Sequence, residues 1–338
     1  MEKFLAKWKG LCGSSRVLRF VDINLRGIGQ VMFQDNPLTG ALFLIAIAWG
    51  SYAAGVPQVA IAGVVAVIVA TLTALWLRVD GESLNAGLFG FNAVLVGLAL
   101  ATFLASGPLL WVYVILGAAI SVVVMLATTN VVKPWGGALT FPFVLTTWLL
   151  LLATYGFSGL AGTALPSGKV VAAFQPYQAS PLQPIDLVSG VFQSISQVFL
   201  KGSGIAALLL LAGLAVNSLA AAGFALGGAI LAVLTAHLFG AESDLITGGL
   251  LGFSPVLTAI ALGTVFYQPS WRVVAYTALA TVFTVIAQSA LNVALTPFAI
   301  PALTAPFVLV TWLFLLPRQC LEAVPVVASD IEKPAAAA

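Results

Sequence analysis

Two sequence motifs occur twice in this chain, in the same order and at nearly the same spacing. Leu139–Leu152 (LTFPFVLTTWLLLL) and Leu303–Leu316 (LTAPFVLVTWLFLL) are identical at eleven of fourteen positions and lie 164 residues apart. Gly87–Ala101 (GLFGFNAVLVGLALA) pairs with Gly249–Gly263 (GLLGFSPVLTAIALG), 162 residues further on. The two offsets indicate a tandem duplication of about half the chain, and such a repeat constrains the whole fold.

The composition predicts a protein of the lipid bilayer. Of its residues, 61% are hydrophobic and only 7% are charged, whereas a soluble domain carries roughly 25% charged residues. The repeated segments are continuous apolar runs of about 20 residues, the length that a helix needs to cross a bilayer, and they lack the alternation of a barrel strand. We therefore predict an all-α integral membrane protein. A duplicated half with an odd number of spans inserts upside down relative to the first half.

Ten transmembrane helices are predicted, five in each half. Those of the first half are Leu38–Ala54, Gln58–Leu77, Phe91–Ala105, Leu109–Ala127 and Leu139–Tyr155. Those of the second half are Val191–Val216, Ala222–Leu238, Phe253–Phe266, Val273–Leu295 and Ala302–Leu316.

Two further segments, Glu82–Gly90 and Glu242–Gly252, are too short to cross the bilayer. Each begins with Glu-Ser, an acid and a hydroxyl that favour the start of a helix. We interpret both as re-entrant half-helices, because broken backbone is tolerated at membrane depth only where it lines a cavity or is buried in protein.

The basic residues predict the orientation. Ten of the thirteen Lys and Arg residues fall on one side of this topology: Lys3, Lys7, Lys9, Arg16, Arg19, Arg26, Arg78, Lys133, Arg272 and Arg318. Lys169 and Lys201 fall on or toward the other side, and Lys333 lies in the tail. Since Lys and Arg concentrate on the cytoplasmic side, we expect a multi-pass protein of the cytoplasmic (inner) membrane with both termini inside the cell.

This topology divides the chain into five parts. We expect a cytoplasmic N-terminal segment at 1–24, the first repeat at 25–156, an external linker at 157–190, the second, inverted repeat at 191–317 and a cytoplasmic C-terminal tail at 318–338.

Chemically active groups are scarce within the predicted spans. Apart from residues near span ends, we expect them to contain no Asp, Glu, Lys or Arg, although ion-coupled transporters use such groups. The single histidine, His237, ends a span, and an interfacial or packing role is favoured over that of a pH sensor or ligand. Without a nucleophile–base pair, we expect neither an enzyme nor a cofactor or metal site. Cys12 and Cys320 lie outside the spans and are predicted to be free thiols.

The uncharged polar residues that remain are repeated in both halves. Gln30-Val31 matches Gln197-Val198, and Thr140 and Thr304 each stand two residues before a proline. One interpretation is structural, since Thr and Pro in membrane helices satisfy backbone groups and adjust kinks. The alternative is a path on a pseudo-two-fold axis, which would be lined by the same positions from both halves.

At these residues the chain resembles the urea transporter family. Leu25–Gly40 (LRGIGQVMFQDNPLTG) is similar to the first signature of that family, and the GLFGFNAVLVGLAL and LTFPFVLTTWL stretches are similar to its pore-helix and Thr-Pro elements. The resemblance covers roughly Leu25–Leu316. It implies a homotrimer with one pore per protomer, two inverted five-helix repeats around each central pore, and passive conduction of urea.

The resemblance also implies which residues line the pore. The outer and inner binding regions would involve Gln30 and Gln197, each beside a valine (Val31, Val198). The narrow slot would be lined by Phe33, Phe91, Leu95, Val198, Leu200, Phe253 and Leu257, with Thr140 and Thr304 at the middle. The chain departs from the family pattern around Gln197, where the family often has Glu and a following Asn-Pro.

The chemistry of urea suits such a path. Urea is planar and neutral, with four N–H donors and one carbonyl acceptor. The end of a half-helix leaves carbonyl groups unpaired, and we expect the turns at Phe91–Leu95 and Phe253–Leu257 to present them in a row. Aromatic faces would admit a flat solute, while an ion would lose its water without gaining an opposite charge.

Two other function classes stay open at this point. An ion-coupled secondary transporter of a small neutral amide would share the inverted repeats, but the absence of ionisable groups argues against it. A membrane-embedded enzyme or a non-transporting assembly protein is the other class. The absence of a catalytic set in this chain argues against the enzyme, and the repeated half-helices argue against both. The small net charge of +2 gives no reason to expect a nucleic-acid partner.

Overall fold

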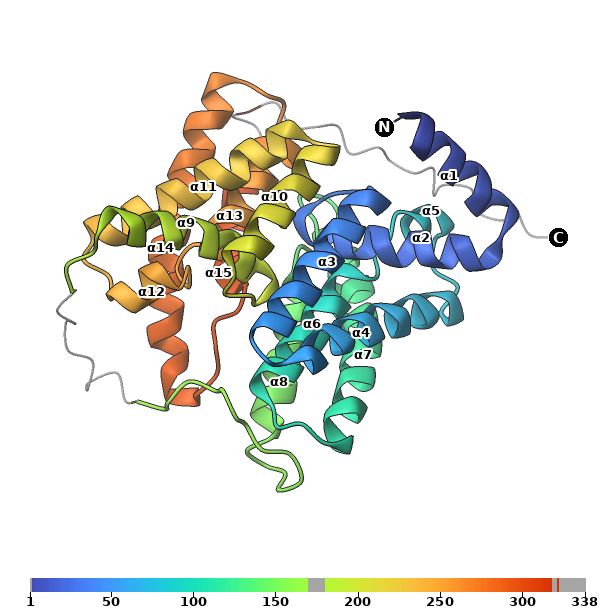
Figure 1. Ribbon diagram of the computed structural model, residues 1–338, viewed down its shortest axis with the longest axis horizontal. Helices are drawn as coiled ribbons and strands as arrows, with labels where there is room; N and C mark the ends of the chain where they lie inside the picture. Colours follow the sequence, from blue (N-terminus) through green and yellow to red (C-terminus); the bar gives the residue numbers. More distant parts are fainter. Residues whose placement is uncertain (1, 170–179, 318–320, 322–338) are drawn as a thin grey trace.

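The computed structural model describes residues 2–169, 180–317 and 321, and the regular elements in this part of the chain are helices (Figure 1). An isolated bridge pairs Leu104 with Gly162. The first half contains α1 (Glu2–Ser14), α2 (Arg16–Gly29), η1 (Gln30–Met32), α3 (Pro37–Ala53), α4 (Pro57–Trp76), α5 (Gly81–Asn85), α6 (Phe91–Phe103), α7 (Pro108–Val132) and α8 (Phe141–Ala153). The second half contains α9 (Pro184–Ser196), η3 (Gln197–Phe199), α10 (Gly204–Asn217), α11 (Leu219–Leu238), α12 (Ser243–Thr247), α13 (Phe253–Ile260), the π-helix η4 (Ala261–Phe266), α14 (Trp271–Leu295), η5 (Thr296–Phe298) and α15 (Ala305–Leu315).

Several of these helices are long and apolar enough to cross a membrane. Four qualify by themselves, namely α4, α7, α11 and the combined segment Trp271–Phe298, and two bent helix pairs bring the number to six. The predicted spans in α6, α8, α13 and α15 coincide with apolar helices, but these are shorter. With 13 residues, α6 and α8 each reach about 20 Å, less than the roughly 30 Å of a hydrocarbon core. The chain is a multi-pass membrane protein with four to six candidate spans.

The predicted span Val191–Val216 is wrong, because the helix breaks in its middle. There α9 with η3 meets α10 at an angle of 71°, and in the first half α2 with η1 meets α3 at 75°. At both breaks one residue adopts a left-handed backbone conformation, Phe33 with φ 62° and Leu200 with φ 55°. The next helix then begins with a polar cap, in which Asn36 accepts from the Leu38 N–H and Ser203 from the Ala206 N–H. A left-handed residue followed by an N-cap ends one helix and starts another.

The two segments interpreted as re-entrant half-helices are also corrected. Within Glu82–Gly90 and Glu242–Gly252 only the five-residue helices α5 and α12 form, followed by turns. The cap of α5 is Asp80, which accepts a hydrogen bond from the Ser83 N–H. That backbone hydrogen bond lowers the pKa of Asp80. One helical turn cannot reach the middle of a bilayer, so the bent pairs are the interrupted helices of this fold.

The predicted boundaries of the two repeats fall inside helices. Position 25 lies within α2, and position 191 lies within α9. Each half follows the same order of elements from these helices onward, and Figure 1 shows the two halves lying on opposite sides of the molecule. The C-terminal tail and Cys320 fall outside the described residues, whereas Cys12 lies in α1 as a free, buried thiol.

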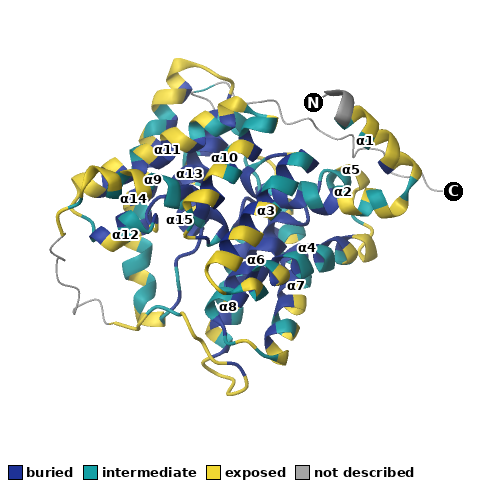
Figure 2. Ribbon diagram, in the orientation of Figure 1, coloured by how far each residue is buried: buried dark blue, intermediate teal, exposed yellow. Residues whose placement is uncertain are grey.

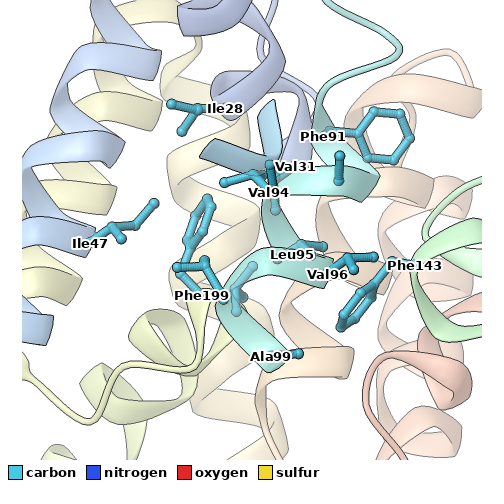
Figure 3. Packing of buried hydrophobic residues seen from close by; sticks show 14 of the residues in the cluster. Ile28, Val31, Ile47, Phe91, Val94, Leu95, Val96, Ala99, Phe143 and Phe199 are labelled. Atoms are coloured by element: carbon cyan, nitrogen blue, oxygen red, sulfur yellow. The ribbon is translucent and has the colours of Figure 1, made fainter. Parts of the chain in front are cut away.

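Helix α6 runs through the centre of the core. Its residues from Phe91 to Ala101 are all buried, and Figure 2 shows buried residues gathered around it while exposed ones lie at the periphery. Figure 3 shows Leu95 and Val96 of this helix together with Phe143 and Phe199, which belong to the same apolar cluster. A helix that is apolar on every side belongs in a protein core or across a membrane, and the surrounding helices enclose α6 in the core.

Lys201 occupies a buried position in the break before α10. Its side chain is only 4% exposed and passes Gly50 of α3, where an added Cβ would come within 3.1 Å of the lysine carbons. The sequence analysis placed Lys201 on or toward the external side and expected no charged residue within a span away from its ends. That expectation was wrong, because Lys201 lies inside the predicted span Val191–Val216, between the two helices of a bent pair. The first-half break holds Gln34 at the matching place, so the two breaks differ in charge.

The turns before α6 and α13 need glycine for two reasons. Gly87 and Gly249 have φ values of 75° and 68°, and a Cβ on Gly249 would lie 2.3 Å from the backbone of Gln193 and Ser194. Gly240 has the same φ of 68° but has nothing within 4 Å of the Cβ position. A comparison of Gly249 with Gly240 therefore separates the cost of a left-handed backbone from the cost of a steric clash.

We expect Gly249→Ala to destabilise the protein much more than Gly240→Ala. In the control variant, Gly240→Ala, the free energy of unfolding falls only by the cost of a left-handed alanine, about 1–2 kcal/mol. Gly249→Ala adds the cost of overpacking, roughly 1–3 kcal/mol more. Thermal unfolding of the purified protein in detergent measures both. Equal unfolding temperatures for the two variants would contradict the close packing of this turn against α9.

Candidate functional site

Two buried threonines meet where the halves of the chain join. The hydroxyl oxygens of Thr140 and Thr304 are 2.6 Å apart and hydrogen-bonded, and the side chains are 2% and 3% exposed. Each threonine immediately precedes a short helix, α8 or α15, and follows a leucine with positive φ. The two positions predicted to mark the middle of the site are thus in direct contact.

Two tryptophans extend this contact reciprocally. The Trp148 indole donates to the Pro301 carbonyl, and the Trp312 indole donates to the Gly137 carbonyl, each at 2.9 Å. In the repeat Trp148 corresponds to Trp312 and Gly137 to Pro301, so each half makes the same bond to the other. Contacts that exchange partners in this way are what a two-fold relation produces. The Thr140–Thr304 pair lies at its centre.

The two predicted glutamines tie down the turns before α6 and α13. The Gln30 amide nitrogen donates to the Ala86 carbonyl at 2.9 Å, and that of Gln197 donates to the Gly248 carbonyl at 3.2 Å. Ala86 and Gly248 occupy equivalent places, directly after α5 and α12. These hydrogen bonds hold the turns next to the first residues of the following helices, Phe91 and Phe253.

The predicted rows of free carbonyl groups do not lie at Phe91–Leu95 and Phe253–Leu257. Both stretches are the first residues of α-helices, whose carbonyl groups bond to amides four residues further on. The unpaired groups come just before them. In the described chain no backbone amide donates to the carbonyls of Leu88 and Phe89, or to those of Leu250 and Leu251. The turns, rather than the helices, therefore offer acceptors.

A cavity of about 560 Å³ brings five predicted site residues together. All five come from the second half: Gln197, Val198, Leu200, Phe253 and Thr304. We call this cavity the second-half vestibule. Phe103 and Phe143 of the first half close its wall, so both repeats contribute to it.

A related aromatic group lies around Phe33. Its ring packs edge-on against Phe307 and Phe266, with centroids 6.2 and 6.4 Å apart. In the repeat these three positions correspond to Leu200, Phe143 and Phe103 of the second-half vestibule. The two ends of the site are thus built from equivalent positions. Phe33 stands beside Phe307 and Phe266 at one end, and Leu200 stands with Phe143 and Phe103 at the other.

The remaining predicted residues do not line this cavity. Val31, Leu95 and Leu257 are at most 2% exposed and pack in the apolar core, and Phe91 is 8% exposed. Gln30 and Thr140 also lie outside the vestibule lining, although Thr140 touches Thr304 within it.

Three polar residues that support the site were missed by the sequence analysis. Asn92 donates to the Leu139 carbonyl at 3.3 Å and accepts from the Phe143 N–H at 3.0 Å, which fixes the start of α8 around Thr140. Gln288 and Asn292, on α14, line the second-half vestibule. The available signal was a polar amide inside an otherwise apolar run, and it is strongest for Asn92, which lies within the repeated GFNAVL motif.

The described part of the chain contains no group of three or more His, Cys, Asp or Glu residues arranged to hold a metal ion. The site offers carbonyl oxygens, hydroxyls, amides and aromatic rings, a set that binds neutral polar molecules through hydrogen bonds.

Comparisons with known proteins agree with the motif resemblance. The family described as "Urea transporter" matches residues 21–319. Urea transporter 1 of Ovis aries is 29% identical over 320 residues, which cover 93% of this chain and 80% of the relative. Urea transporter 1 of Rattus norvegicus is 30% identical over 310 residues, covering 89% of this chain and 77% of the relative. With a family match across nearly its whole length, the chain belongs to the urea transporter family.

Proposed function

We propose that this protein conducts urea passively across the cytoplasmic membrane, down its concentration gradient. The observation that carries the proposal is the Thr140–Thr304 hydroxyl pair, buried between two equivalent polar turns on a two-fold pattern of contacts. Relatives that share about 30% of its residues are named Urea transporter 1. Family members are transporters rather than enzymes, and the donor and acceptor groups of this site suit binding rather than bond cleavage.

The groups along the proposed path complement urea. The unpaired carbonyls before Phe91 and Phe253 accept hydrogen bonds from its amide groups, while the hydroxyls between the halves bond to it midway. The aromatic side chains at either end favour a flat solute. A hydrated ion would lose its water here without finding a counter-charge, at a cost far larger than any hydrogen bond returns.

The proposed architecture follows the repeat. Ten membrane helices in two inverted sets of five would enclose a pore in each protomer of a homotrimer, with both termini cytoplasmic and residues 157–190 outside. The short helices α6, α8, α13 and α15 support this arrangement, because paired short helices can meet at mid-membrane where a path is lined by their ends.

The first test is urea flux into proteoliposomes, followed by stopped-flow light scattering, with and without a Na⁺ or proton gradient. Fast entry that ignores both ion gradients is the expected result. Absent flux would overturn the proposal, and flux that requires an ion gradient would favour the coupled transporter of small amides instead. Protein-free liposomes provide the background rate.

Removing a hydroxyl of the central pair should slow urea conduction. We expect Thr140→Val and Thr304→Val each to lower flux about tenfold, since a lost hydrogen bond to the solute costs about 1 kcal/mol or more. Matched controls are Thr147→Val and Thr311→Val in α8 and α15, whose buried hydroxyls have no partner among the described residues. Flux that falls equally in all four variants would contradict a special role for the central pair.

Shortening the aromatic side chains should loosen selectivity. We expect Phe253→Ala to raise the ratio of N-methylurea to urea flux several-fold, because Phe253 lines the vestibule. Phe91→Ala should do so less, since its ring is mostly buried. Phe239→Ala, at a 67% exposed side chain, serves as control. An unchanged ratio in Phe253→Ala would mean that the ring only packs.

A further inference from the structure

A chain of polar side chains reaches the second-half vestibule from inside the protein. The Ser254 hydroxyl donates to the Gln288 side-chain oxygen at 2.6 Å, and the Gln288 amide nitrogen donates to the Asn292 side-chain oxygen at 3.2 Å. Ser254 and Gln288 are 0% and 1% exposed, whereas Asn292 is only partly buried. The buried members therefore hold the side chain of Asn292 at the cavity wall.

The orientation of this chain leaves a donor at its outer end. Because the Asn292 oxygen accepts from Gln288, its Nδ2 group remains available, and within the described residues it makes no hydrogen bond to the protein. The two buried members of the relay are hydrogen-bonded, and the relay ends beside the cavity in a donor that has no protein partner among the described residues. This placement favours an acceptor on a bound molecule.

Donors are otherwise scarce in the vestibule. The turn carbonyls only accept, and Gln197 uses one of the two hydrogens of its amide nitrogen in the bond to the Gly248 carbonyl. Of the two hydroxyl hydrogens of Thr140 and Thr304, one is used between them. Urea-type solutes carry one carbonyl oxygen that must find donors, so the Nδ2 group of Asn292 meets a need that the carbonyl-lined turns leave open.

The relay exists in only one half. Helices α7 and α14 both have 25 residues, and the positions of Gln288 and Asn292 correspond to Met125 and Thr129 of α7. There the Asn92 amide approaches the Met125 sulfur at 3.6 Å, and no amide relay forms. The duplication has therefore diverged at this point, and the two ends of the path differ in their donors.

We propose that Asn292, positioned by Gln288, is a solute-binding residue that donates a hydrogen bond to the carbonyl oxygen of a small planar amide in the second-half vestibule. This inference rests on the proposed function and deepens it. It makes the second-half end of the path the tighter of the two binding regions.

The test is the urea concentration that half-saturates flux through proteoliposomes. For Asn292→Leu, which keeps the size but removes the donor, we expect this concentration to rise about tenfold, the effect of one lost hydrogen bond. Gln288→Met, which copies the first-half residue, should raise it less, because Asn292 loses only its support. Thr129→Val, at the equivalent place in the first half, should leave it unchanged.

Thiourea separates a binding role from a structural one. Its sulfur is a weaker acceptor than the urea oxygen, so Asn292→Leu should change its half-saturation far less. A reshaped vestibule would alter both solutes alike, and that result, or an unchanged value for urea, would overturn the inference. If Asn292→Leu does not fold, Asn292→Ala decides in the same assay. Wild-type protein without any urea flux would instead refute the proposed function itself.

Discussion

The interrupted helices of this protein leave backbone polar groups inside an apolar interior, and the rest of the structure depends on how those groups are satisfied. An unpaired amide or carbonyl away from water costs free energy comparable to a lost hydrogen bond. Gln30 and Gln197 bond to the turns after α5 and α12, Trp148 and Trp312 bond across the halves, and Asn92 holds the start of α8. Two of these residues, Gln30 and Gln197, are predicted binding residues, and both also support the backbone of a turn.

The same requirement links the fold to the proposed path. A turn can line a passage only if it is held rigidly and still has free acceptors. The glutamines bond to one carbonyl in each turn, at Ala86 and Gly248. Two residues further on, the carbonyls of Leu88 and Leu250 have no backbone partner among the described residues. Acceptors that are fixed in place bind a neutral donor without the cost of reorganising the protein.

The two halves differ where the chain has diverged since the duplication. Lys201 stands in the place of Gln34 and lies against Gly50. The Ser254–Gln288–Asn292 relay stands in the place of Asn92, Met125 and Thr129. A symmetric backbone therefore carries asymmetric side chains. Urea is symmetric about its C=O bond. The difference between the two ends of the path therefore comes from the side chains of the protein.

The sequence by itself determined the membrane class, the duplication, the family resemblance and the equivalence of Thr140 and Thr304, because each of these follows from composition, from motifs or from residues repeated at a constant offset. The tertiary structure decided where helices end. The break at Leu200 depends on a left-handed backbone residue and a serine cap, features too local to outweigh the apolar run Val191–Val216. It also decided which carbonyls are free and that Gln288 and Asn292 face the vestibule, since these depend on partners brought together from distant helices. Periodicity and repeats are encoded along the chain, whereas hydrogen bonds between distant segments exist only once it has folded.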